Sequence, residues 1–105
     1  MPIKKEVLRM DEGGRRFARL VKAGDFLFVA GTTGQDIDGA RGNVGIQTRR
    51  IFEKVRLVLE QNLSSLENVI SMTTYLTDYG KLPEVSAIRN EFMHSPAAGT
   101  VVQVS

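Results

Sequence analysis

Phe26-Leu27-Phe28-Val29-Ala30-Gly31 is the stretch that decides the fold, with Ala23-Gly24-Asp25 before it and Thr32-Thr33-Gly34 after it. Five consecutive apolar residues between turn residues are too few for a free-standing helix and are typical of a strand. Because they do not alternate with polar residues, we expect both faces of this strand to be covered. Gly31 and the two threonines then end the strand with accessible backbone and small hydroxyl groups, which suit the binding of a small ligand.

The residues before this stretch predict two more strands. Phe17–Lys22 alternates apolar and polar residues, and Ala23-Gly24-Asp25 is short enough to turn it back into the central strand as a hairpin. Ile3–Met10 alternates loosely and predicts an edge strand. Paired glycines between these two strands predict a loop.

The residues after it predict a surface loop and then a long helix. From Val44 to Asn62 the apolar residues recur at helical spacing on one face. We interpret the basic residues of this segment as a solvated face. Ser64 and Glu67 have the spacing of a capping box at the start of a short turn.

A strand, a helix and a final strand complete the chain. Val69–Thr77 predicts a strand with Ile70, Met72 and Leu76 on one face and no charge on the other. Asp78 suits a cap and Pro83 a first turn, so a second helix is expected over Lys81–Met93. Its expected buried stripe is Leu82, Val85, Ile88 and Phe92, and the segment 96–99 is expected to connect it to a last strand at 100–104.

The expected order is therefore β-β-β-α-β-α-β in one α/β domain over residues 1–105. Two helices can cover one face of such a sheet. No predicted element is left to cover the other face, although the central strand and the uncharged face of Val69–Thr77 both need cover. The simplest solution is another copy of the same chain, so we predict a homo-oligomer.

Composition narrows the possible functions. The formal net charge is only +2 and no stretch carries a run of like charges, which disfavours nucleic-acid and membrane-surface partners. The chain has no cysteine, which excludes disulfides, thiolate metal sites and a cysteine nucleophile. No signal peptide or membrane-spanning run is recognisable, so a cytoplasmic location is expected. No metal or cofactor is predicted.

Several segments in order along the chain resemble the RidA/YjgF family, also known as endoribonuclease L-PSP or translation-inhibitor proteins. The matching segments are 21–31, Gln47-Thr48-Arg49, 64–69, 73–78 and Val102-Gln103-Val104. The resemblance implies a chorismate-mutase-like α/β fold with a mixed sheet and two helices on one face. It also implies a homotrimer with ligand clefts between subunits and, in active members, hydrolysis of reactive enamines and imines to a ketone and ammonia.

The chain departs from this family at positions that active members use. The arginine that holds the substrate carboxylate falls on Gly99, or on Ala98 if counted from Pro96-Ala97, and the family tyrosine falls on Phe17. The Gly-Pro dipeptide of active members is replaced by Arg15-Arg16. A family glutamate lies on a final strand that is absent from these 105 residues, so we expect one unpaired sheet edge.

The positions that still match the family imply a ligand cleft lined mostly by backbone groups. Gly31 and Val101 match positions whose main chain contacts the ligand, and hydroxyl groups of three threonines can reach the same cleft. The predicted lining residues are Phe17, Gly31, Thr32, Thr33, Gly99, Thr100 and Val101. A neighbouring arginine, Arg15, Arg16 or Arg19, can restore a cation, although surface arginines are common at such a junction.

Three classes of function follow. The first is a hydrolase of an imine, enamine or related small nitrogen metabolite with altered specificity. The second is a non-catalytic ligand-binding or regulatory trimer, which the missing arginine and tyrosine favour. The third is the ribonuclease implied by one family name, for which the sequence shows neither a basic track with interleaved aromatic residues nor an acid/base pair. The single histidine, His94, is interpreted as a partner of a helix dipole.

Overall fold

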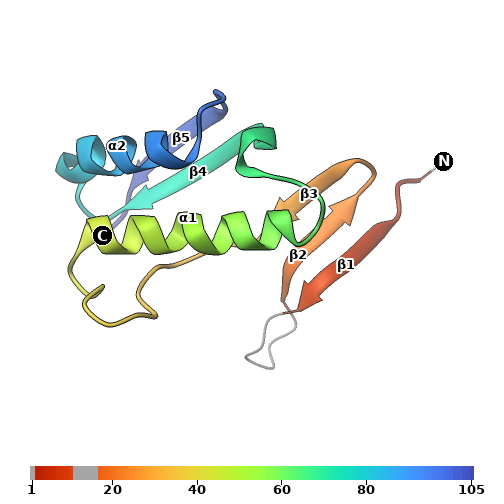
Figure 1. Ribbon diagram of the computed structural model, residues 1–105, viewed down its shortest axis with the longest axis horizontal. Coiled ribbons are helices and arrows are strands. Elements are labelled where there is room, and N and C mark those ends of the chain that lie inside the picture. Colours follow the sequence, from red (N-terminus) through yellow and green to blue (C-terminus); the bar gives the residue numbers. More distant parts are fainter. Residues whose placement is uncertain (1, 11–16) are drawn as a thin grey trace. The chain divides into compact units, whose positions relative to one another are not determined.

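The computed structural model describes residues 2–10 and 17–105. They fall into two compact units, Met1–Thr32 and Thr33–Ser105. The order of strands and α-helices is the predicted β-β-β-α-β-α-β, so the α/β class expected from the sequence is confirmed (Figure 1).

The first unit is a three-stranded antiparallel sheet in the order β1-β2-β3. Its strands are β1 (Lys5–Met10), β2 (Ala18–Ala23) and β3 (Phe26–Val29). Ala23 pairs with Phe26, so Gly24 and Asp25 form a two-residue hairpin loop. Gly24 has φ of +58°, a conformation that glycine adopts without steric cost, and this explains the tight turn.

One face of this sheet is open. Phe28 lies opposite Val21 and Phe26 opposite Ala23, and paired residues share a face. Phe26 and Phe28 are 56% and 59% exposed, whereas Leu20 on the other face is fully buried. We expected both faces of the central strand to be covered. The face that carries Phe26 and Phe28 is open, so this prediction is wrong for that face.

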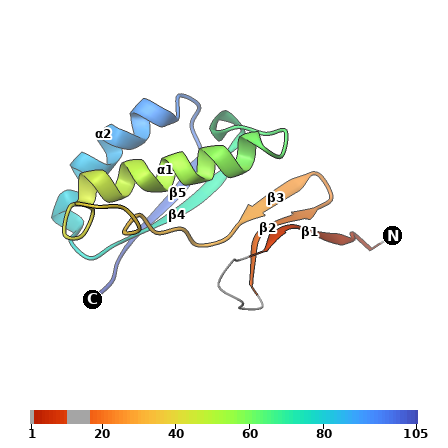
Figure 2. The ribbon, with the colours of Figure 1, turned by 60° about the horizontal axis from the view of Figure 1, so that its bottom comes forward.

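The second unit holds both α-helices and a pair of parallel strands. The helices are α1 (Val44–Glu60) and α2 (Leu82–Phe92), and the strands are β4 (Ser71–Leu76) and β5 (Ala98–Gln103). Two short 3-10 turns, η1 (Leu66–Asn68) and η2 (Tyr79–Lys81), flank β4. Helix α2 connects two parallel strands, as a crossover must. Both helices lie on the same side of β4 and β5 (Figures 1 and 2).

Apolar packing between the helices and the strand pair forms the core of this unit. The ring of Phe52 on α1 stacks on Phe92 of α2 with centroids 5.3 Å apart, and the guanidinium of Arg56 lies 5.2 Å from the Phe92 ring centroid. The other buried apolar side chains come from both helices, η1, β4, the loop before α1 and the residue after α2. They are Ala40, Val58, Leu59, Leu66, Leu76, Val85, Ile88 and Met93.

The opposite face of the strand pair is open and uncharged. Ser71, Thr73 and Tyr75 on β4 are exposed, in alternation with less exposed or buried neighbours. Thr100 lies opposite Thr73, and Val102 opposite Tyr75. The prediction that this face of the strand carries no charge is confirmed, and no described residue of the chain covers it.

Three predictions change in detail, and a fourth is confirmed. Ile70, expected on the covered face, lies just before β4 and is 65% exposed. The capping box of Ser64 and Glu67 is wrong, because Ser65 is the cap residue of η1 and Glu67 Oε1 instead accepts the backbone N–H of His94 at 2.9 Å. Ala98 and Gly99 belong to β5 rather than to the connector. The cap at Asp78 is confirmed, since its side chain accepts the N–H of Gly80 at 2.9 Å.

The strands form two hydrogen-bonded groups. Within the described residues β1 and β3 pair only with β2, and β4 and β5 pair only with each other. Four strands therefore each have one edge without a strand partner, where one such edge was expected. Among the helices of the described ranges, none has the length and apolar character needed to cross a bilayer.

The end of α1 holds a leucine in an unfavourable backbone conformation. Leu63 has φ of +63°, and its side chain is fully exposed. The turn is closed around it by the N–H of Ser64, which donates to the carbonyl oxygen of Leu59 at 2.9 Å. Helices commonly end with glycine in this conformation, because a Cβ is strained there.

Replacing this leucine should therefore stabilise the protein. Removing the strain of a left-handed conformation raises the free energy of unfolding by about 1–2 kcal/mol. The greater flexibility of glycine in the unfolded chain lowers it by about 0.5–1 kcal/mol. We expect Leu63→Gly to raise the free energy of unfolding by about 0.5–1 kcal/mol in urea titrations at a fixed protein concentration. Leu57→Gly, at an exposed helical position, should lower it by a similar amount. A loss of stability in Leu63→Gly would contradict the argument.

Candidate functional site

The end of the β2–β3 hairpin brings several predicted site residues together. The N–H of Ala30 donates to the carbonyl oxygen of Arg19 at 3.0 Å, which continues the pairing of the two strands by one residue. Arg19 therefore lies across from Ala30, next to Gly31 in the chain. The hydroxyl of Thr32 donates to the Ala30 carbonyl oxygen at 3.0 Å, which holds the segment in a tight turn.

Gly31 leaves open space at this end of the hairpin. A Cβ built on it would meet no heavy atom within 4 Å, apart from its chain neighbours. Arg19 is partly exposed and shares the open sheet face with Val21 and Phe28, because alternate residues of a strand point the same way. No carboxylate of the described residues lies within ion-pair distance of its guanidinium. Phe17, just before β2, is exposed.

The segment after Thr32 is held on α1 by a cluster of charges. The ammonium of Lys54 donates to the carbonyl oxygen of Thr33 at 2.8 Å and lies 3.1 Å from Asp36 Oδ2. Arg50 donates to both carboxylate oxygens of Asp36, at 3.3 and 3.1 Å. The hydrogen bond from Arg50, with further help from Lys54, holds the pKa of Asp36 well below its usual range.

This cluster corrects the interpretation of the helix's basic residues as a solvated face. The side chains of Arg50 and Lys54 are only 31% and 21% exposed, and both are engaged with the loop. Arg49 is likewise paired, with Glu91 of α2. The signal that was missed is the spacing of Arg50 and Lys54, which places both on one side of the helix to meet one acid.

Gly34 fixes the same segment by steric means. It is buried, and a Cβ built there would lie 2.8 Å from the Cα of Gln47 and closer still to the carbonyl oxygen of that residue. Only a residue without a side chain allows this approach of the loop to α1. Thr33 is therefore held between the Lys54 hydrogen bond and the Gly34 contact.

The other predicted residues of the second unit lie along β5. Gly99 pairs with Met72, Thr100 with Thr73 and Val101 with Thr74. Gly99 and Thr100 are exposed and Val101 is partly buried. The nearest atom to a Cβ built on Gly99 is the Met72 carbonyl oxygen, at 4.0 Å, so this position has room for a side chain.

The predicted site residues are thus divided between the two units. Phe17, Gly31 and Thr32 belong to the first, and the second contains Thr33, Gly99, Thr100 and Val101. The candidate cations Arg15 and Arg16 lie outside the described residues. Residues 2–10 and 17–105 contain no group of three or more His, Cys, Asp or Glu that could hold a metal ion.

Comparison with known proteins identifies the family. The family model for endoribonuclease L-PSP matches residues 12–105. The chain belongs to the RidA/YjgF family. RutC family proteins of Pyrococcus abyssi and Pyrococcus horikoshii are 30% and 32% identical to it over 93 and 96 residues. Each alignment covers 85% of this chain, and 73% and 74% of the two relatives respectively.

Solved structures show the same fold. A protein of Entamoeba histolytica superposes with a TM-score of 0.84 at 19% identity, covering 97% of this chain and 87% of the other. RidA from a Psychrobacter species gives 0.77 at 22% identity, covering 99% of this chain and 85% of the other. These similarities confirm the RidA/YjgF fold expected from the sequence.

The charge cluster around Asp36 makes the stability of the protein depend on pH. Because the pKa of Asp36 is lowered on folding, its contribution is present above the pKa of an unfolded aspartate, about 3.9, and is lost as the pH falls through the lower pKa of the folded state. We expect Asp36→Asn to be less stable than the unmodified protein at pH 7. The difference should shrink steadily as the pH is lowered below about 4.

Thermal unfolding followed by circular dichroism at several pH values measures this difference. Asp38→Asn, in the same loop, is the matched control, since no described cation lies within ion-pair distance of Asp38. An Asp36→Asn deficit that did not change between neutral and acidic pH would contradict the ion-pair explanation.

Proposed function

We propose that this protein is a hydrolase of small imines, enamines or related nitrogen compounds that carry a carboxylate. The observation that carries the proposal is the position of Arg19, whose backbone pairs with Ala30 next to the open Gly31 and whose guanidinium has no ion-pair partner among the described carboxylates. The family resemblance supplies the reaction class, and the position of Arg19 supplies a cation that the chain lacks at Gly99.

The chemistry needs few side chains. A guanidinium can donate two hydrogen bonds to the two oxygens of a substrate carboxylate and so hold the C=N group in place. Water then adds to the carbon of the C=N bond, the nitrogen takes up protons, and the C–N bond breaks to release ammonia and a ketone. Backbone groups near Gly31 need no reorganisation to polarise the reacting group, which lowers the barrier.

We propose further that the protein acts as a homotrimer with its clefts at the subunit interfaces. The open face that carries Phe26 and Phe28, and the uncharged face that carries Thr73 and Tyr75, support this assembly. Burying each phenylalanine contributes about 1.5–3 kcal/mol. The expected place of the assembly is the cytoplasm.

A second candidate is a trimer that binds a small ligand without catalysis. It is favoured by the exposed glycine at position 99 and by Phe17, which has no hydroxyl group to take part in proton transfer. The ribonuclease suggested by the family name has no comparable support, because the described residues include no basic track with interleaved aromatic residues.

Ammonia release from enzymatically generated imines of α-keto acids tests the hydrolase. Gly31→Leu should abolish release, because the leucine fills open space and leaves the fold intact. Arg19→Gln should raise KM about tenfold or more for carboxylate-bearing imines, through loss of a charge-assisted hydrogen bond. Arg89→Gln, on α2, is the control that should retain wild-type kinetics.

The same assay separates the two candidates. Release that is equal in the unmodified protein and in Gly31→Leu would contradict catalysis. A rise in melting temperature with small carboxylates that Arg19→Gln removes would then identify the binding trimer instead.

The assembly is tested by light scattering on a size-exclusion column. We expect a trimer for the unmodified protein and smaller species for Phe28→Glu, because the substitution places a charge on the open face of β3. Leu57→Glu, at an exposed position of α1, is the control and should leave the trimer intact. A monomeric unmodified protein would contradict the proposed assembly.

A further inference from the structure

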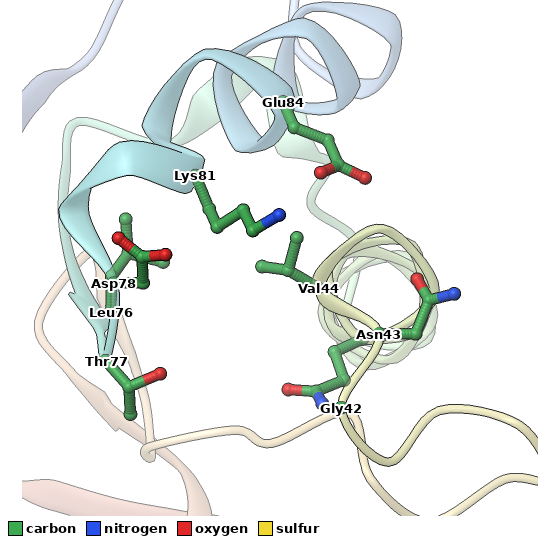
Figure 3. Close-up of a pocket in the computed structure, with 9 residues that line it drawn as sticks. Gly42, Asn43, Val44, Leu76, Thr77, Asp78, Lys81 and Glu84 are labelled. Atoms are coloured by element: carbon green, nitrogen blue, oxygen red, sulfur yellow. The ribbon is translucent and has the colours of Figure 1, made fainter.

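A pocket in the second unit shares no lining residue with the predicted cleft. It has a volume of about 460 Å³. It is formed where β4 ends, where η2 leads into α2, and where α1 begins. Its lining residues are Gly42, Asn43, Val44, Gln47, Leu76, Thr77, Asp78, Lys81 and Glu84 (Figure 3). In sheets with parallel strands and crossover helices, ligands bind outside the carboxyl ends of the strands, and this pocket has that position.

The pocket contains a cation and two anions. Figure 3 shows the Lys81 side chain extending into the space, with the carboxylate of Glu84 on the side of its ammonium group and that of Asp78 on the opposite side. None of the ion pairs found among the described residues involves these three side chains. Unlike Arg50 and Lys54, they are therefore not committed to one another or to a neighbouring charge.

A backbone hydrogen bond holds one of the two carboxylates in place. Asp78 Oδ1 accepts the N–H of Gly80, which leaves Oδ2 available. Glu84 lies near the first turn of α1, where a Cβ built on Gly45 would be only 2.7 Å from Glu84 Oε1. Both residues are exposed to solvent.

The neutral part of the lining adds hydrogen-bonding and apolar surface. The side-chain nitrogen of Gln47 donates to the Ala40 carbonyl oxygen at 2.8 Å, so its oxygen remains available to a ligand. Thr77 contributes a hydroxyl group, and Val44 and Leu76 contribute apolar surface. A ligand that suits this lining has both charges at one end and a short apolar or amide side chain at the other.

We propose that this pocket binds a free α-amino acid. The carboxylate of the ligand pairs with Lys81, its ammonium group pairs with Glu84, and its side chain lies along Val44. A purely anionic ligand would leave Glu84 unpaired, and a purely cationic one would leave Lys81 unpaired. The zwitterion is the ligand class that satisfies both of these charges. This site and the proposed hydrolase site share no residue, so either can fail without the other.

Three related small molecules test the assignment on the unmodified protein. L-Norvaline carries both charges, pentanoate lacks the ammonium group, and butylamine lacks the carboxylate. Each is titrated to millimolar concentrations into ¹⁵N-labelled protein while the backbone amide signals are followed. We expect saturable shifts at residues 42–45 and 77–81 with L-norvaline, and binding of each single-charge analogue at least about tenfold weaker.

Two variants assign the charges. Lys81→Met keeps the length of the side chain and should weaken L-norvaline and pentanoate about tenfold, with butylamine unchanged. Glu84→Gln should weaken L-norvaline and butylamine, with pentanoate unchanged. Lys22→Met, at an exposed position of β2, is the control and should bind all three as the unmodified protein does.

The proposal is overturned if L-norvaline causes no saturable shift at the pocket residues, or if Lys81→Met binds it unchanged. Equal binding of L-norvaline and pentanoate would also overturn it, since that result identifies a carboxylate site without a partner for the ammonium group. These comparisons depend on amide signals and not on turnover, so an inactive hydrolase would leave them unaffected.

Discussion

Two helices cannot cover both faces of the strands on which they pack. Helices α1 and α2 bury one face of β4 and β5, and their packing on those strands, with Phe52 stacked on Phe92, forms the core of that unit. The other face presents Tyr75 to solvent, and in the first unit Phe26 and Phe28 are similarly open. Exposed apolar side chains on sheet faces favour association of subunits. Each Å² of apolar surface that is removed from water stabilises the assembly by about 25 cal/mol. The proposed trimer and its clefts follow from this constraint.

The loop at the start of the second unit, from Thr33 to Asp36, is held on α1 by electrostatic and steric contacts acting together. Lys54 donates to the Thr33 carbonyl oxygen, Arg50 and Lys54 both pair with Asp36, and Gly34 lies directly on the backbone of α1. Partly buried ion pairs with several hydrogen bonds are stronger than exposed ones. As a result, the position of Thr33 depends on side chains that bind no ligand themselves.

The open glycine and the missing arginine give this RidA/YjgF protein a distinct distribution of charge. Gly99 leaves its strand without a cation, whereas Arg19 presents one on the β2–β3 hairpin, and Lys81 directs another into a separate pocket. Ligands that carry a carboxylate can therefore be attracted at two places. The two places differ in that the pocket of Lys81 also contains two acids, which selects for a zwitterion over a simple anion.

Local patterns in the sequence determined the elements and their order. Helical spacing of apolar residues predicts α1, uninterrupted apolar residues predict β3, and Asp78 predicts the cap that precedes α2. Tertiary structure decided the features that depend on residues far apart in the chain. The engagement of Arg50 and Lys54 with Asp36 and the hydrogen bond from His94 to Glu67 are of this kind. Periodicity shows which face of an element is apolar, but a polar group's partner depends on packing in three dimensions.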